Sequence, residues 1–231
     1  MLWNNPVIQA VFWSALTIAS FWLGKKLHRR LGRWWSSPLV TTPLVLIAVA
    51  LGLHESYRDY IHETHWLVAL LGPATVAFAV PIWEQRALIA KRWPILLAGV
   101  VTGSSMAMLS AWGLAELLGL NDSLTLSLLP RSISTPFAMT VSGEIGGVPD
   151  LTAVFVVITG VFGAALGEVV LKVLPLRSAL ARGALFGMGA HGAGVAKAHG
   201  LGREEGAVAG LVMVLVGLVN VLAAPLLAYV L

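Results

Sequence analysis

The chain has 231 residues, of which 58% are hydrophobic and only 11% are charged, and its mean hydropathy is +0.85. Soluble domains carry roughly 25% charged residues, so this composition excludes an ordinary soluble protein and predicts an integral membrane protein. The formal net charge is +4, but the basic residues stand in short clusters between apolar runs, as topology signals do. A nucleic-acid partner is therefore not expected. The absence of Cys excludes disulfides, thiolate chemistry and Cys-based metal sites.

Six apolar runs predict transmembrane helices and an all-α fold. The first, Pro6–Gly24, has 19 residues, close to the roughly 20 that a hydrocarbon core requires. The basic run KKLHRRLGR follows it, which predicts an external N-terminus and a cytoplasmic loop at residues 25–33. The other five runs are Pro38–Leu53, Trp66–Trp83, Pro94–Leu118, Leu151–Leu171 and Gly206–Leu231.

Two further segments, residues 127–150 and 183–205, are predicted to be broken helices. They contain the sequences LPRSISTPFAMTVSGEIGGVPD and FGMGAHGAGVAKAHG, in which Gly, Pro and hydroxyl residues interrupt apolar runs. In a membrane protein, non-helical backbone is tolerated only where it is buried in protein or lines a wet cavity. Function is therefore expected at these two segments.

The placement of charge favours re-entrant segments over fully crossing ones. If the first segment crosses, Lys172, Arg177 and Arg182 lie outside, against the positive-inside rule. If it dips in from outside and the second segment dips in from the cytoplasm, 12 of the 15 Lys and Arg residues are cytoplasmic. At an offset of 57 residues Ser134 falls on His191, so an inverted repeat is also possible.

Composition divides the chain into two halves. All nine Trp residues lie at or before Trp112, with only six Gly, whereas the remaining 119 residues hold 18 Gly and no Trp. Trp anchors helices at the membrane interface, while Gly permits close helix packing. Residues 1–120 are thus expected to form a scaffold and residues 121–231 the functional region.

The candidate site residues lie in the broken segments. A helix that begins inside the membrane offers N–H groups to a carboxylate, and Ser134 and Thr135 stand at such a start, before Pro136. Their hydroxyls are interpreted either as substrate ligands or as helix caps. In the second segment His191, flanked by Gly192 and Gly194, could donate to a carboxylate, carry a proton or serve only structure.

Four other polar residues are candidates for contact with an ion, a proton or an entering anion: Arg131, Glu168, Lys197 and Asn220. Lys197 could neutralise an anion, pair with Glu168 or extend to the cytoplasmic surface. No metal ion or cofactor is expected, because the His residues lack the spacing of metal ligands. No HExxH, GxSxG or paired Asp motif is present, so an enzyme is not expected.

The sequence LPRSISTPFAMTVSGEIGGVP, followed by GMGAHGAGVAKA and EEGAVAGL, resembles the LrgB/CidB family of bacterial inner-membrane proteins. The resemblance covers nearly the whole chain and includes Trp83, Glu84 and Gln85. It implies an antiholin-like role in murein hydrolase regulation and a small holin-like partner of the LrgA/CidA type. Plastid relatives export glycolate and import glycerate, and bacterial members are linked to pyruvate. Gly192 and Gly194 make the second segment richer in Gly than the family pattern.

Two functions follow as expectations. The first is a carrier for small carboxylates such as glycolate, glycerate or pyruvate, which works by alternating access with substrate held at the broken helices. The second is an antiholin-like regulator of murein hydrolase export and lysis. The expected setting is the bacterial inner membrane, with the lipid bilayer around the helices and a homodimer formed through the scaffold half.

Overall fold

The computed structural model describes residues 5–230, and every regular element in that range is helical. The expected all-α membrane fold is confirmed. Five of the described helical stretches are long and apolar enough to cross a membrane: Pro6–Leu31, Tyr57–Glu84, Arg86–Leu117, Pro149–Val173 and Arg203–Tyr229. Pro38–Leu53 is apolar but shorter. These six stretches correspond to the six predicted spans.

The chain folds as two compact units, Met1–Ala74 and Thr75–Leu231. This boundary follows from contacts, whereas the predicted division near residue 120 concerns composition and function. Contacts assign α6 to the second unit, although the helix carries Trp93 and Trp112. The functional division at residue 120 therefore stays a prediction.

The first unit consists of helices that begin and end at strong local signals. Asn5 caps α1 and Gly32 ends it with a φ of 62°; Ser37 caps α2 before Pro38. Ser56 begins α3 with a capping box. The elements are α1 (Pro6–Leu31), η2 (Trp34–Ser36), α2 (Pro38–Leu53) and α3 (Tyr57–Ala69), and α4 (Leu71–Ala77) continues towards the second unit.

The second unit gathers the remaining helices around a large hydrophobic core, and a smaller cluster is formed by Phe186, Ala198 and Ala209. Phe137, Val141, Val156, Val208 and Leu211 are among the buried residues of the large core. The elements are α5 (Ala79–Glu84), α6 (Arg86–Leu117), α7 (Asp122–Leu128), η3 (Leu129–Ser132), α8 (Thr135–Glu144), α9 (Pro149–Val173), α10 (Ala179–Leu201) and α11 (Arg203–Val230).

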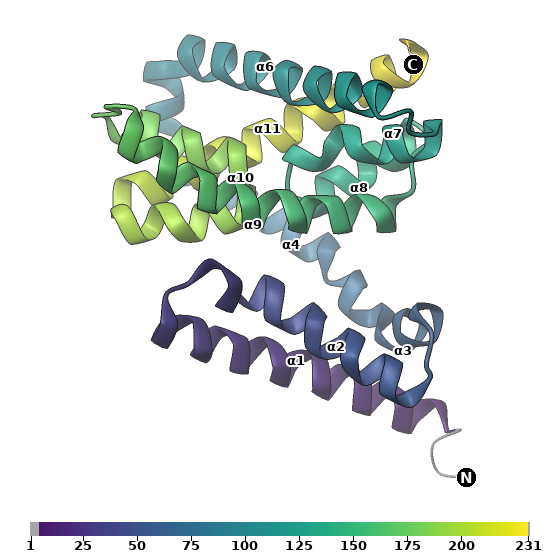
Figure 1. Cartoon of the computed structure of the whole chain (residues 1–231). Helices are drawn as coiled ribbons and strands as arrows, with labels where there is room; N and C mark the ends of the chain where they lie inside the picture. The colour runs from purple at the N-terminus through teal and green to yellow at the C-terminus, as the bar shows by residue number, and fades with distance from the viewer. Residues whose placement is uncertain (1–4, 231) are drawn as a thin grey trace. The chain divides into compact units, whose positions relative to one another are not determined.

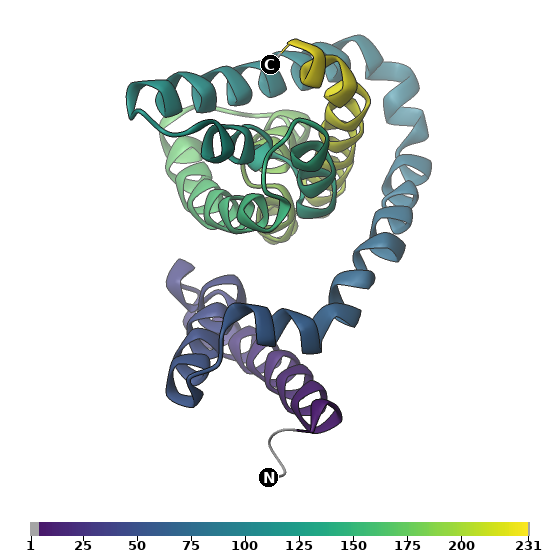
Figure 2. The same ribbon diagram turned by 90° about the vertical axis from the view of Figure 1, so that its right-hand side faces the viewer.

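The segment made of α7, η3 and α8, here called the first hairpin, returns to the level at which it starts. The hydroxyl of Ser127 accepts from the backbone N–H of Val148 at 2.8 Å, and the hydroxyl of Thr152 donates to the Ser127 carbonyl at 2.9 Å. These bonds join the last turn of α7 to the start of α9. In the view of Figure 2, the first hairpin lies among α6, α9 and α11.

Helix α10 is also a hairpin, here called the second hairpin, because its chain reverses at His191. The backbone there has φ 36° and ψ −121°, which is not helical. A Cβ on Gly194 would collide with the carbonyl group of Phe186, although eight residues of unbroken helix would separate these positions by about 12 Å. At the open end, Arg182 Nη1 lies 3.8 Å from Glu205 Oε1.

The two hairpins lie at opposite ends of α9 (Figure 1). The 25 residues of α9 span about 37 Å at 1.5 Å per residue, enough to cross a hydrocarbon core of about 30 Å. The ten residues of α8 and each arm of the second hairpin span only about 15–18 Å. Each hairpin is thus about half a membrane deep, and its tip is expected near the middle.

Candidate functional site

The tips of the two hairpins meet beside the middle of α9. Helix α10 packs against η3 at the tip of the first hairpin, and Met188 of the second hairpin lines the same small cavity as Ser132 and Ile133. A Cβ on Gly160, in the middle of α9, would lie only 2.8 Å from His191 Cε1. Glycine at position 160 therefore leaves the space that the ring occupies.

Ser134 stands at the N-cap position of α8, but it does not act as a cap. Its side chain is 6% exposed, and its hydroxyl has no hydrogen-bond partner within residues 5–230. Its carbonyl accepts the N–H of Ala138. The first-turn N–H groups of Thr135 and Phe137 have no acceptor inside the helix, and Pro136 has no N–H to satisfy. The capping interpretation of Ser134 is therefore not supported.

His191 is the counterpart of Ser134 in the second hairpin. The side chain is 5% exposed, and Nε2 has no hydrogen-bond partner in the part of the chain that the structure describes. Gly194 allows the second arm to pack against Phe186, whereas a Cβ on Gly192 would meet nothing within 4 Å. Of the two predicted glycines, only Gly194 is needed for close packing.

Among the described residues, four buried side-chain atoms have no hydrogen-bond partner: Trp13 Nε1, Thr42 Oγ1, Ser134 Oγ and His191 Nε2. Two of them belong to the first unit. The two in the second unit both lie at the helix breaks that the sequence predicts as functional. A buried polar group without a partner costs about 1–3 kcal/mol, so the pair indicates a place where a ligand can supply the missing bonds.

The charged candidates are positioned differently from one another. Arg131 is half-buried at the tip of the first hairpin, not at its mouth. Lys197 and Glu168 form an ion pair between the second hairpin and α9, with both side chains partly exposed. Of the three readings of Lys197, the structure therefore shows the pairing with Glu168. No group of three or more His, Asp or Glu residues that could hold a metal ion occurs within residues 5–230.

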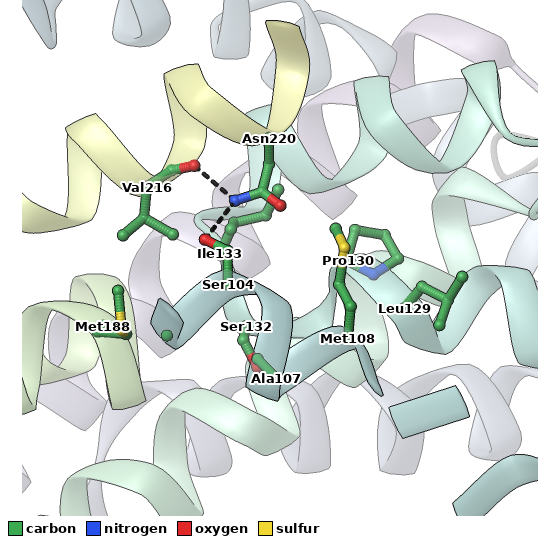
Figure 3. A pocket seen from close by; sticks show the side chains of 11 residues that line it. Ser104, Ala107, Met108, Leu129, Pro130, Ser132, Ile133, Met188, Val216 and Asn220 are labelled. Atoms are coloured by element: carbon green, nitrogen blue, oxygen red, sulfur yellow. Dashed lines mark hydrogen bonds between the residues drawn. The ribbon is translucent and has the colours of Figure 1, made fainter. Parts of the chain in front are cut away.

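Asn220 lines a small cavity that borders both tips (Figure 3). Its Nδ2 donates to the Ser104 hydroxyl at 2.9 Å and to the Val216 carbonyl at 2.7 Å. The cavity has a volume of about 10 Å³, room for about one water molecule. Ser132 lines it from the first hairpin and Met188 from the second, so movement of either tip would change its size.

Sequence reasoning missed a buried hydroxyl network at the base of the first hairpin. Thr152, Ser142 and Ser127 are all 0% exposed, and the hydroxyls of Thr152 and Ser142 form a hydrogen bond of 2.7 Å. Ser104 on α6, the partner of Asn220, was missed as well. The available signal was a hydroxyl residue inside an apolar run, because such a group needs a partner when it is buried.

These features define a multi-pass, all-α membrane protein in which two opposed broken segments meet. The LrgB-like family matches residues 17–230, and the chain belongs to this family. It is 38% identical to the uncharacterized protein YwbG of Bacillus subtilis over 92% of this chain and 94% of the relative. No solved structure matches the chain.

The names of some relatives describe a role. The antiholin-like protein LrgB of Bacillus subtilis is 32% identical over 93% of each chain. The holin-like protein CidB of Staphylococcus epidermidis is 29% identical over 96% of this chain and 97% of the relative. The resemblance to the LrgB/CidB family is thereby confirmed.

Proposed function

We propose that the chain is a membrane carrier for small carboxylates of the glycolate, glycerate or pyruvate kind. The observation that carries the proposal is the unpartnered, buried hydroxyl of Ser134 at the start of α8, where the two hairpin tips meet. A helix start within a membrane protein attracts a carboxylate through its free N–H groups and the positive end of its dipole. The first turn of α8, with Thr135 and Pro136, is the proposed carboxylate site.

The arrangement of the hairpins suits alternating access. One hairpin opens at each end of α9, and the tips of both bury Ser134 and His191. Separation of the tips towards one end would expose the site to that side only, which is the behaviour expected of opposed broken segments in transporters. Residues 121–231 would move in this cycle, while the Trp-rich residues 1–120 anchor the protein in the inner membrane with the N-terminus outside.

Uptake by proteoliposomes tests the carrier. Ser134→Ala should lower kcat/KM for labelled glycolate, glycerate or pyruvate roughly 10- to 100-fold, because one hydrogen bond to a charged ligand is worth about 1.5–3 kcal/mol. Thr140→Ala is the matched control, since Thr140 is an exposed hydroxyl residue of the same helix. Uptake that is equal in both variants, or no saturable uptake by the wild type, would contradict the proposal.

A second candidate function is antiholin-like or holin-like control of murein hydrolase export and lysis. The names of the relatives LrgB and CidB favour it, and they support it better than they support transport. A holin-like membrane partner of the LrgA/CidA type belongs to this proposal, whereas a homodimer formed through residues 1–120 belongs to the proposed carrier. Lysis assays in cells that carry Ser134→Ala separate the functions: intact lysis control with lost uptake would show that control does not depend on transport.

A further inference from the structure

The two hairpins are fastened at their bases by different kinds of contact. At the base of the first hairpin, the buried hydroxyls of Ser127, Ser142 and Thr152 form hydrogen bonds with one another and with the backbone. A Cβ on Gly147 would lie 2.9 Å from the backbone nitrogen of Ser127, so the chain passes this network without spare room. Moving the first hairpin away from α9 would leave buried hydroxyls without partners, which is unfavourable.

The second hairpin has an ion pair on each of its arms, close to its base. Lys197 of the second arm pairs with Glu168 of α9. In the first arm, Arg182 Nη1 lies 3.8 Å from Oε1 of Glu205, which belongs to α11. Three of these four side chains are 40–45% exposed. Partly exposed charges exchange one partner for another at little cost, so these pairs can separate without leaving a buried group unpaired.

The position of Glu168 suits a contact that opens and closes. The residue lies five positions before the end of α9 at Val173, which is about 7–8 Å by helical rise. Since α9 is only a few ångströms longer at each end than a hydrocarbon core of about 30 Å, Glu168 lies near the edge of this core. An unpaired charge is unfavourable there, yet the long side chain of Lys197 can reach the surface when the pair separates.

The second hairpin also occupies a position at which it can close one side of the protein. A Cβ on Gly163 of α9 would lie 2.2 Å from the carbonyl oxygen of Gly189, and a Cβ on Gly187 would lie 2.4 Å from that of Ala209 in α11. The hairpin therefore fits closely against both helices. It fills the half of the membrane between the two tips and the surface predicted to be cytoplasmic, so its displacement would open that half only.

We infer that the second hairpin is the gate over the two tips, that the pairs Lys197–Glu168 and Arg182–Glu205 are its latch, and that the first hairpin stays fixed on α9. The latch ties each arm to a different helix, so both pairs must separate before the hairpin can leave its place. The inference rests on the proposed function for the site that the gate exposes. The movement itself requires no substrate and can be measured separately.

The reactivity of a thiol at the tip of the first hairpin tests the latch. The chain has no Cys, and Ser132 lines the small cavity between the tips. With Ser132→Cys in the purified full chain, Lys197→Gln should raise the rate of reaction with a water-soluble maleimide about 2- to 5-fold, the effect of losing one partly exposed ion pair. Lys172→Gln is the matched control, because Lys172 is an exposed Lys at the same end of α9.

Two further variants distinguish a latch from general loosening of the fold. Lys197→Glu should also raise the rate, and the addition of Glu168→Lys should restore it, because the exchanged charges attract each other again. A thiol at the base of the first hairpin, Ser142→Cys, should react at a rate that Lys197→Gln does not change. If Lys197→Gln does not fold, Glu205→Gln opens the other pair and gives the same comparison.

The outcomes separate the latch from the carrier. An unchanged rate at Ser132→Cys, no restoration by the exchanged pair, or an equal rise at Ser142→Cys would overturn the latch and leave the carrier intact. The absence of saturable carboxylate uptake would overturn the carrier, while the labelling rates would still decide whether the second hairpin opens.

Discussion

The reversal of the chain at His191 can be tested with two neighbouring glycines of α10. In the structure a Cβ on Gly194 would lie 2.7 Å from the carbonyl carbon of Phe186 and closer still to its oxygen, whereas a Cβ on Gly192 would meet nothing within 4 Å. The obstacle at Gly194 is backbone, which cannot move unless the hairpin opens. We expect Gly194→Ala to cost about 3 kcal/mol, the upper part of the range for overpacking.

Helix propensity acts in the opposite direction at both positions. Replacing Gly by Ala in a helix stabilises it by about 1 kcal/mol, so Gly194→Ala should lose about 2 kcal/mol and Gly192→Ala should gain up to about 1 kcal/mol. For a chain of this size 1 kcal/mol shifts the melting temperature by about 2–4 °C. The two variants should therefore differ by roughly 6–12 °C.

The assay is thermal stability in detergent, measured as the monodisperse fraction that remains after heating. An unbroken α10 predicts a different result, because Gly194 would then face no carbonyl of Phe186 and both substitutions would stabilise. Gly194→Ala as stable as Gly192→Ala would thus refute the hairpin.

Two other predictions concern the first hairpin and the topology. Thr152→Val should lower stability by about 1–3 kcal/mol, because it removes a buried hydroxyl that bonds to both Ser127 and Ser142, whereas Thr140→Val at an exposed site should change it little; equal melting temperatures would contradict the network. The chain lacks Cys, so single thiols at Glu144 and Arg203 can be labelled selectively: Glu144→Cys should react from outside and Arg203→Cys from the cytoplasm, and labelling of both from one side would contradict opposed hairpins.

Local signals in the sequence were sufficient to predict where the helices break. Pro130 and Pro136 interrupt helical hydrogen bonding where they stand, and Ser134 follows from its place before the start of α8. The six apolar runs follow from hydropathy in the same way. Each of these features depends on a few residues that are neighbours in the chain, so a single sequence is enough to predict it.

Other features depend on contacts between distant residues, and the sequence did not predict them. The hydrogen bond between Ser127 and Thr152 joins residues 25 positions apart, and the hydrogen bond between Ser104 and Asn220 joins residues 116 positions apart. Likewise, hydropathy cannot show that the Ser134 hydroxyl makes no capping bond or that the imidazole of His191 lies against Gly160. Such bonds arise from the packing of whole helices, and the hydroxyl residues show only that some partner is required.

The backbone conformation at His191 also distinguishes this residue from its neighbours in α10. Its φ of 36° with ψ of −121° lies in a region that non-glycine residues rarely adopt, at a cost of about 1–3 kcal/mol. Glycine would adopt it at little cost, and glycines stand nearby at Gly189 and Gly192, where the backbone does not require them. The chain thus has its imidazole at the one strained position of the hairpin. Strained residues of this kind cluster at ligand-binding and switch regions, which supports the proposal that His191, and not the glycines beside it, takes part in ligand recognition.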